Sequence, residues 1–350
     1  MLQSLQIDAV LTPSISLATR LRLLLNQQLN ILLYAYVNIH KLSFREPRYQ
    51  VFYISTRCQQ QRCLVYNVSS QIPRNPPSEG AAHRPLRPLH LNIHGGAFIG
   101  GIPEIDHDFC SQLARTTGAV VVSASYRFAP RFAFPAAIDD IDDIIVWLQI
   151  NARTQLGADP ELFTVSGSSA GGNLALAASQ NERLQRKEAG IKGAVTFFAA
   201  IDLRIPPQEK PKPPGFPKYD PLSFMMPLFD AYAGPARAKE KANSRLSPIV
   251  APYLTLPPHI FMIVPEIDIL FNEQVTFLRR VLTEIEEDPG IKDSERSIKA
   301  MFFEKGFHGW INLPSFLVGD ADKKAAFGAA CNFIQDIHRN HGSNYGEKQD

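Results

Sequence analysis

A serine in a glycine-rich turn is the side chain of this sequence best placed to act as a nucleophile. Ser169 lies at the centre of a G-x-S-x-G pentapeptide that begins at Gly167 and ends at Gly171. The apolar residues 161–165 before it favour a buried strand, and residues 173–178 after it favour a helix. A strand, a sharp turn and a helix in this order hold the hydroxyl above a sheet in a strained backbone conformation. We predict a nucleophile at Ser169; the alternative is a Ser/Gly loop without chemistry.

A serine hydroxyl is a poor nucleophile at neutral pH, so it needs a base that takes its proton and an acid that orients the base. In a strand–turn–helix arrangement these partners follow on later strand-end loops, first the acid and then the histidine. His308 follows a predicted strand in a run with glycines on both sides, and Asp268 follows an earlier predicted strand. Glu266 is the second candidate for the acid. The joint fit of order and position predicts the set Ser169, Asp268 and His308.

A glycine-rich loop is predicted to stabilise the negative charge that develops during such an attack. Backbone N–H groups do this when they point at the oxygen that gains the charge. Gly95 and Gly96 follow a predicted strand over residues 89–93, and Ala170 directly follows the nucleophile. We expect these three residues to form an oxyanion hole and the side chain of His94 to fix the loop. A flexible Gly-Gly turn is the alternative.

Four further side chains are predicted to line the substrate-binding site. Phe98 lies beside the glycine-rich loop, and Ser168 lies beside the nucleophile. Phe229 and Tyr232 belong to a later, proline-rich segment. These two aromatic residues would line an acyl pocket or, equally well, pack their segment onto the sheet.

The elements that must position these groups alternate between strands and helices. We expect strands over residues 49–57, 62–69, 89–93, 119–126, 161–165, 191–201, 259–264 and 298–303, and helices over residues 106–116, 135–151, 271–286 and 321–339. Such alternation requires right-handed crossovers between parallel strands. The predicted fold class is α/β, with a mostly parallel, doubly wound sheet, helices on both faces and an antiparallel hairpin at its start.

Residues 203–257 interrupt this alternation and are rich in proline. Only residues 235–243 of the segment are helix-like. We predict that the segment is an insertion above the carboxyl ends of the strands, where open α/β sheets bind their ligands. The chain would then divide into a core of residues 49–202 and 258–350, an inserted cap of residues 203–257 and an N-terminal helical cap segment of residues 1–48.

The N-terminal segment contains a leucine-rich stretch over residues 17–41. Its apolar residues recur at helical spacing and predict an amphipathic helix that covers a hydrophobic site. Asparagine and glutamine side chains interrupt the stretch, which argues against a membrane-spanning helix. Adsorption of this helix to a membrane surface is the minority alternative. The predicted apolar stripe consists of Leu21, Leu25, Leu29, Leu32, Tyr36 and Ile39.

The composition is that of a soluble globular protein and indicates no charged macromolecular partner. The 350 residues include 36 basic and 34 acidic side chains, for a formal net charge of +2. Because no basic block stands out, we expect no nucleic acid as a partner. Residues 1–13 contain no basic side chain, so we expect no signal peptide and a cytoplasmic location. Four cysteines without a C-x-x-C pair favour free thiols.

A run of aspartates within residues 139–143 formally matches a metal-binding motif of terpene cyclases. The run falls in the first turns of a predicted helix, where carboxylates interact favourably with the helix dipole. The chain is also predicted to be α/β rather than all-helical, and no second metal motif is apparent. We therefore expect no metal ion and no cofactor.

Six short segments occur in a fixed order along the chain. They are H-G-G-A-F from His94, Y-R-F-A-P from Tyr126, F-P-A-A-I-D-D from Phe134, G-S-S-A-G-G from Gly167, E-I-D-I-L from Glu266 and G-F-H-G-W from Gly306. Together they resemble the hormone-sensitive-lipase family of α/β-hydrolases, which includes arylacetamide deacetylases and carboxylesterases. The resemblance implies an eight-stranded sheet, a cap and hydrolysis of carboxylic esters, often with short or medium acyl chains. It implies the same triad and oxyanion hole as the residues themselves predict.

Five residues depart from the usual motifs of that family. Ala97 replaces the third glycine of the oxyanion motif, which is tolerated if its φ is negative. Ser168 stands where an acidic residue commonly precedes the nucleophile. Pro265 and Ile269 differ on either side of the acid, and Arg131 replaces a glutamate common after the Y-R-L-A-P motif. No departure removes a catalytic group, so a specialised member of the family is expected.

We therefore predict a serine hydrolase that cleaves a small carboxylic ester, such as a specialised metabolite, through an acyl-enzyme. Lactonisation, elimination, cyclisation or acyl transfer on a bound metabolite is the first alternative. A ligand-binding receptor without turnover is the second, although receptors of this kind lack the catalytic histidine that His308 supplies. A homodimer paired through an edge strand also stays open.

Overall fold

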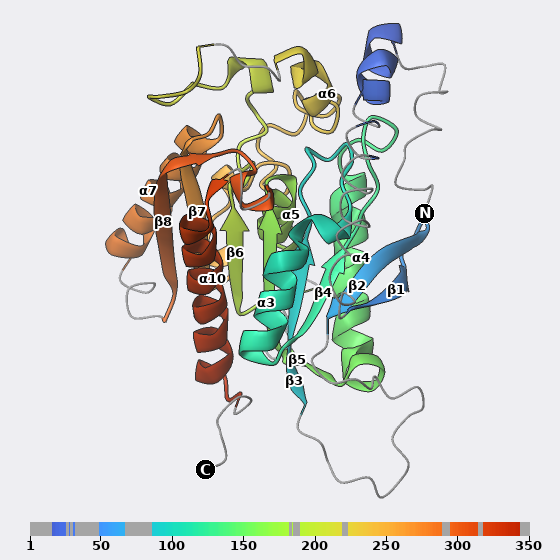
Figure 1. Ribbon diagram of the computed structural model, residues 1–350, viewed down its shortest axis with the longest axis vertical. Helices are drawn as coiled ribbons and strands as arrows, with labels where there is room; N and C mark the ends of the chain where they lie inside the picture. The colour runs from blue at the N-terminus through green and yellow to red at the C-terminus, as the bar shows by residue number, and fades with distance from the viewer. Residues whose placement is uncertain are drawn as a thin grey trace, which may run out of the picture.

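One twisted sheet organises the computed structural model (Figure 1). The structure describes residues 16–25, 28, 31, 49–66, 86–181, 184, 190–218, 223–288, 295–313 and 318–343. Within these residues the sheet has eight strands in the order β1-β2-β4-β3-β5-β6-β7-β8. The strands are β1 (Tyr49–Ser55), β2 (Gln60–Tyr66), β3 (Arg87–Ile93), β4 (Val120–Ala124), β5 (Ala158–Ser168), β6 (Gly193–Phe197), β7 (His259–Ile267) and β8 (Ser297–Phe307).

The sheet is parallel except at one edge. β1 and β2 form an antiparallel hairpin, and β2 also pairs antiparallel with β4. The other neighbours are parallel, so β3, β5, β6, β7 and β8 end at the same edge. The interior strand β4 reads V-V-V-S-A and is buried throughout, as expected for a strand covered on both faces. The predicted α/β class and mostly parallel sheet are confirmed.

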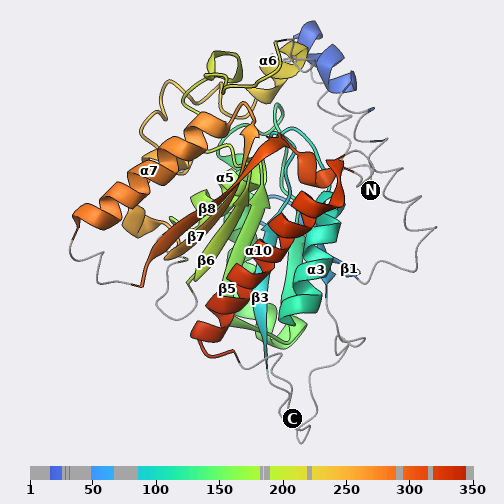
Figure 2. The ribbon, with the colours of Figure 1, turned by 60° about the vertical axis from the view of Figure 1, so that its left-hand side comes forward.

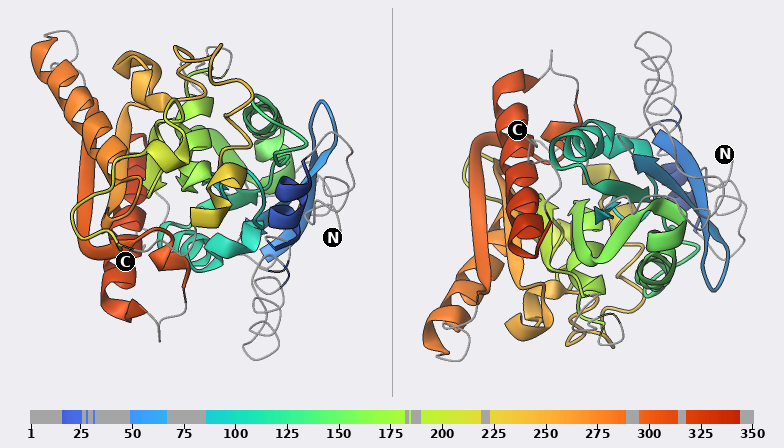
Figure 3. Two further views of the ribbon diagram at one scale, coloured as in Figure 1. Left: turned by 90° about the horizontal axis from the view of Figure 1, so that it is seen from above. Right: turned by 90° about the horizontal axis from the view of Figure 1, so that it is seen from below.

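Helices cover both faces of the sheet (Figures 2 and 3). On one face lie α3 (His107–Thr117) and α10 (Asp320–Asn340), which contact each other. On the other face lie α4 (Ala136–Asn151), α5 (Ala170–Ala178) and α7 (Phe271–Glu287). Each crossover thus returns the chain to the amino ends of the strands, so the parallel strands all end at the carboxyl edge, where the loops that carry the predicted catalytic residues begin.

The sheet separates two apolar cores. In one core, Phe109 of α3 and Phe327 of α10 contact Phe197 of β6, with ring centroids 4.9 to 6.1 Å apart. Leu174 of α5 and Phe277 of α7 belong to the other core, which continues into the segment above the strands. Burial of each such side chain contributes about 1.5–3 kcal/mol. The two cores therefore hold the strand ends as a rigid platform.

The segment between β6 and β7 lies above the carboxyl ends of the strands (Figure 1). The predicted helix over residues 235–243 is wrong, because these residues form successive turns. They carry no apolar stripe that a helix would bury. Arg237 instead bonds to Asp230 and to the carbonyl of Leu203. The described elements of the segment are η4 (Pro207–Glu209), η5 (Ser223–Met225), α6 (Met226–Phe229), η6 (Pro248–Val250) and η7 (Tyr253–Thr255). The division into core and cap stays a proposal.

Residues 17–25 form a helix that lies beside α6 (Figures 1 and 2). Leu23 is fully buried, whereas Leu21 and Leu25 are 54% and 53% exposed. A residue two positions away lies on nearly the opposite side of a helix, so the described part of the predicted stripe faces solvent. The remaining stripe residues, Leu29, Leu32, Tyr36 and Ile39, lie outside the described residues. In the described part of the chain, no helix combines the length and apolar character needed to cross a membrane.

Candidate active site

Ser169 occupies the turn between β5 and α5 with a φ of 51° and a ψ of −115°. This conformation is strained for a residue with a side chain. The turn is held by a hydrogen bond from the Ser169 amide to the carbonyl of Phe197 over 2.8 Å. It also needs a glycine beyond it, since a Cβ at Gly171 would lie 1.9 Å from the carbonyl oxygen of Ile93. The predicted nucleophile therefore stands on a rigid turn at the carboxyl edge of the sheet.

His308 joins Ser169 to Asp268 through two hydrogen bonds. The Oγ of Ser169 lies 3.0 Å from Nε2 of His308, and Nδ1 of His308 lies 2.9 Å from Oδ2 of Asp268. The second oxygen of Asp268 accepts a bond from the amide of Leu270 over 2.9 Å. His308 bonds to Asp268 rather than to the second candidate, Glu266. The loops after β5, β7 and β8 thus bring three distant residues into one hydrogen-bonded chain.

Burial and charge act in opposite directions on His308. Burial disfavours the protonated imidazolium, whereas the charge of Asp268 and its hydrogen bond favour it, and together they raise the pKa of His308 above its ordinary value. Asp268 is fully buried, while the His308 side chain keeps 40% of its surface exposed. The imidazole can therefore exchange a proton on its exposed side while the buried carboxylate holds its orientation.

The loop after β3 closely approaches the turn of the nucleophile. A Cβ at Gly95 would lie 3.0 Å from the carbonyl oxygen of Ser168 and 3.4 Å from the Cβ of Ser169. The next residue, Gly96, has a φ of +124°. Ala170 is the first residue of α5, where helix amides have no intrahelical partner. The three residues predicted to donate their amides, Gly95, Gly96 and Ala170, therefore lie beside the nucleophile turn. Their stabilisation of an oxyanion stays a prediction.

The backbone of Ala97 adopts a left-handed conformation, which is unfavourable for a residue with a Cβ. An unstrained alanine at this position needs a negative φ, and the structure has a φ of +51°. A left-handed conformation costs about 1–2 kcal/mol for a residue with a Cβ. Two backbone bonds hold the loop nonetheless, from Ile99 to Gly96 over 2.9 Å and from Ala129 to Phe98 over 2.8 Å. The expectation of an unstrained alanine is therefore wrong.

His94 is fully buried beneath this loop. Its Nδ1 lies 2.6 Å from the carbonyl oxygen of Gly95, and its Nε2 lies 3.3 Å from Oγ of Ser125. The ring stacks on Tyr126 at 4.8 Å, and the Tyr126 hydroxyl donates to the carbonyl of His94. Burial lowers the pKa of His94 to about 4. A neutral, buried imidazole with these contacts fixes the loop, as the sequence predicts.

The residues predicted to contact substrate are mostly buried. Phe98 and Tyr232 stack with ring centroids 4.1 Å apart and are 3% and 1% exposed. Phe229 is half-buried and packs against the same core. Ser168 is 2% exposed, and its hydroxyl donates to Asp106. The stacked rings join the cap segment to the oxyanion loop, and contact of these four side chains with a substrate stays a prediction.

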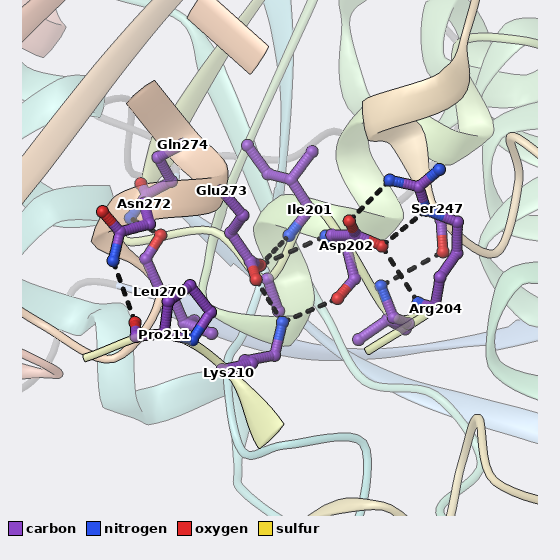
Figure 4. A network of polar contacts seen from close by, with 12 residues as sticks. Ile201, Asp202, Arg204, Lys210, Pro211, Ser247, Leu270, Asn272, Glu273 and Gln274 are labelled. Carbon is purple, nitrogen blue, oxygen red and sulfur yellow. Dashed lines mark hydrogen bonds and ion pairs between the residues drawn. The ribbon is translucent and has the colours of Figure 1, made fainter. Parts of the chain in front are cut away.

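A polar network ties the cap segment to the sheet (Figure 4). Lys210 of the cap segment contacts Glu273 of α7 and the carbonyl of Asp202, which follows β6. Glu273 accepts bonds from the amides of Ile201 and Asp202 over 2.7 and 3.1 Å. Arg204 pairs with Asp202 beside them over 2.7 Å. No feature of the sequence pattern identifies these buried partners, because they come from three separate segments.

The aspartates of α4 bond to arginines. Asp140 accepts from Arg127 over 2.9 Å, and Asp142 accepts from Arg245 over 2.6 Å. Asp143 accepts from Arg57 over 2.8 Å. These ion pairs use the carboxylate oxygens that a metal ion would need. Among the described residues, no group of three or more His, Cys, Asp or Glu side chains is arranged to hold a metal ion.

Comparison with known proteins shows the family. A family model described as an alpha/beta hydrolase fold matches residues 90–300, which is more than half of the chain. The chain belongs to the alpha/beta hydrolase family. The resemblance carried by the six sequence segments is thereby confirmed. Among solved structures, this hydrolase is similar to an esterase of Pyrobaculum calidifontis, with a TM-score of 0.66 and 25% identity over 93% of this chain and 94% of that one.

The curated relatives of this alpha/beta hydrolase are similar to it over only part of their length. It is 36% identical over 114 residues to the versiconal hemiacetal acetate esterase of Dothistroma septosporum, which is 32% of this chain and 34% of that protein. It is 29% identical over 195 residues to an arylesterase of Saccharolobus solfataricus, which is 55% of this chain and 62% of that protein. The match thus spans less than two thirds of the length of each of these relatives.

Proposed function

We propose that this alpha/beta hydrolase cleaves a carboxylic ester through an acyl-enzyme on Ser169. The observation that carries the proposal is the hydrogen-bonded chain from Ser169 through His308 to Asp268, with distances of 3.0 and 2.9 Å. A hydroxyl, an imidazole and a buried carboxylate in this order are the groups that acyl transfer needs. The same histidine distinguishes the proposal from a receptor without turnover.

In the first half of the reaction, Nε2 of His308 accepts the proton of the Ser169 hydroxyl while Oγ attacks the ester carbonyl carbon. The carbonyl oxygen gains a negative charge, which the amides of Gly95, Gly96 and Ala170 stabilise. Asp268 stabilises the imidazolium without taking its proton. The imidazolium then donates its proton to the departing alkoxide, which leaves as an alcohol, and the acyl group stays on Oγ.

In the second half, a water molecule replaces the alcohol and attacks the acyl carbon. His308 accepts one proton of this water, and the same three amides stabilise the second oxyanion. Collapse of this intermediate breaks the bond between the acyl carbon and Oγ of Ser169. The proton on His308 returns to Oγ, and the carboxylic acid leaves. The 40% exposure of the His308 side chain allows the water to reach it.

We propose that the enzyme prefers ester substrates with a short acyl group. The stacked rings of Phe98 and Tyr232 fill the space beside the oxyanion loop, so a long chain has little room on that side. The names of two relatives, versiconal hemiacetal acetate esterase and ethyl acetate hydrolase, refer to acetate esters. In this proposal the alcohol group of the ester lies on the exposed side of the site.

A series of 4-nitrophenyl esters with acetyl, butyryl and octanoyl groups tests both proposals. We expect turnover that is fastest with acetate or butyrate and falls by a factor on the order of 10³ or more in Ser169→Ala. A fluorophosphonate should label Ser169 in the wild type. Ser111→Ala of α3 is the control, because this serine lies away from the catalytic loops, and it should keep wild-type turnover. Undiminished turnover in Ser169→Ala would contradict the mechanism.

A further inference from the structure

A buried carboxylate lies where the loops of the site converge. Asp106 ends the helix η2 (Pro103–Asp106) before α3 and is 7% exposed. Three neutral side chains donate hydrogen bonds to it. They are Asn92 at 3.0 Å, Ser168 at 3.2 Å and Asn312 at 3.0 Å.

Each donor belongs to a segment that carries a proposed catalytic group. Asn92 lies near the end of β3, just before the oxyanion loop. Ser168 is the last residue of β5 and directly precedes the nucleophile. Asn312 lies in η8 (Trp310–Asn312), which follows His308. One carboxylate therefore links the three loops whose relative positions decide whether the reaction proceeds.

Other buried carboxylates of the protein are bonded differently. Glu104, on the same short helix η2, pairs with Arg62 of β2 over 2.6 Å. Asp140 and Asp142 pair with arginines in the same way. Asp106 instead takes three neutral donors, and burial raises its pKa. A carboxyl group is costly to bury, and hydrogen bonds to an ionised acceptor are about twice as strong as neutral ones. The three neutral donors around Asp106 therefore suit a carboxylate that holds loops together.

The sequence supports the same assignment. Ser168, which directly precedes the nucleophile, has a hydroxyl and no charge of its own. Asp106 brings a carboxylate to the Ser168 hydroxyl from a different segment of the chain. The charge is thus present beside the nucleophile turn, but η2 rather than β5 supplies it.

We propose that Asp106 is a positioning residue that fixes the nucleophile turn, the oxyanion loop and the His308 segment relative to one another. The proposal rests on the proposed function, since it concerns the geometry of that reaction. Asp106 itself touches neither substrate nor the reacting atoms. Its loss should therefore slow the chemical step, with little change in substrate affinity, because a displacement of about 1 Å between reacting groups costs up to 100-fold in rate.

Asp106→Asn tests this with kcat and KM for 4-nitrophenyl acetate. The amide keeps the size of the side chain but has only one oxygen to accept bonds, so one or more of the three donors loses its partner. We expect kcat to fall about 10- to 100-fold while KM stays within about 3-fold. Glu104→Gln is the matched control, because it removes a buried carboxylate from the same helix without touching a catalytic loop. Its kcat should stay within about 3-fold of wild type.

A relocation of the charge gives a second test that a merely structural role would not pass. Asp106→Ser combined with Ser168→Asp moves the carboxylate to the nucleophile strand. We expect this double variant to recover kcat about 10-fold over Asp106→Ser alone. Asn312→Ala, which removes only the bond toward the His308 segment, should lower kcat about 3- to 10-fold in a protein that keeps its fold.

The proposal is overturned if Asp106→Asn keeps wild-type kcat, or if Glu104→Gln loses as much. If Asp106→Asn does not fold, wild-type kcat in Asn312→Ala together with no recovery in the double variant also overturns it. Absence of ester turnover and of fluorophosphonate labelling in the wild type would instead contradict the proposed function. The two failures are therefore distinguishable.

Discussion

Lys210 of the cap segment forms a buried ion pair with Glu273 in the first turn of α7, with side chains 4% and 7% exposed. The same carboxylate accepts the amides of Ile201 and Asp202. The pair therefore fastens the proline-rich segment to the ends of β6 and β7 at the edge where Ser169 stands. The proline-rich segment is therefore attached to the sheet at the same edge as Ser169.

Lys210→Met should destabilise the protein, because it leaves Glu273 buried without its cationic partner. Breaking a buried pair on one side costs about 3–5 kcal/mol. Chemical unfolding measured on Lys210→Met and on the double variant Lys210→Met, Glu273→Gln provides the check. The double variant removes both charges and keeps an oxygen for the two amides, so it should recover part of the loss. Equal stability of Lys210→Met and wild type would show that the pair contributes nothing.

The pH dependence of kcat/KM should report the protonation of His308. The imidazole must be neutral to accept the serine proton, so activity is lost as the pH falls through its pKa. Asp268 raises this pKa, and the midpoint of the acidic limb should therefore lie above about 6.5.

Asp268→Asn should move that midpoint to lower pH, because it removes the charge and the hydrogen bond of Asp268, which raise the pKa of His308, while burial still lowers it. It should also lower kcat by a factor on the order of 10⁴. The rate of fluorophosphonate labelling as a function of pH follows the same ionisation and suits slow variants. An acidic limb that stays at the wild-type position in Asp268→Asn would contradict this assignment.

Ala97→Gly should relieve backbone strain in the oxyanion loop. Glycine adopts a φ of +51° without the cost that a Cβ adds, although it also gives the unfolded chain more freedom. We expect the free energy of unfolding to rise by up to about 1 kcal/mol, as measured by thermal unfolding. The control, Ala325→Gly in the exposed part of α10, should lower it by about 1 kcal/mol. A comparable loss in both variants would show that Ala97 is not strained.

Gly171→Ala should disrupt the nucleophile turn. The added Cβ would overlap the backbone of β3, which cannot move aside as a flexible side chain would. We expect a loss of stability of at least about 3 kcal/mol, or no folded protein. Gly328→Ala in α10, where no atom lies within 4 Å of the added Cβ, should instead be stabilising by about 0.5–1 kcal/mol. Thermal unfolding followed by circular dichroism distinguishes the two variants. An unfolding midpoint of Gly171→Ala equal to that of the wild type would contradict the predicted overlap with β3.

Local sequence patterns predict the strands and the main helices of this fold well. β4 is a run of β-branched residues, and the residues before Ser169 form an apolar run. Both the spacing and the composition of these runs favour buried strands. The closeness of Ser169, Asp268 and His308 follows from the topology, since parallel strands end at one edge. Hydrogen bonds in the structure join these three residues as their spacing predicts.

Long-range partners and backbone angles are not visible in such patterns. The φ of Ala97 depends on the bonds around its loop, and the burial of Leu23 rather than Leu21 depends on which side of a helix meets the cap. Asp106 lies in a stretch with no distinctive motif, and only the serine at 168 hints that a carboxylate is missing. Contacts between remote segments decide these features, and one sequence by itself does not record them.

Within the part of the chain that the structure describes, β8 is the last strand, lies at an edge of the sheet and pairs with β7 alone. His308 follows it directly. During synthesis, domains fold from the N-terminal side as the chain leaves the ribosome. On the proposed mechanism, a nascent chain that has released the serine turn but not β8 lacks its proton acceptor, His308. On the proposed mechanism, the protein therefore stays inert toward esters until β8 and the His308 loop have left the ribosome.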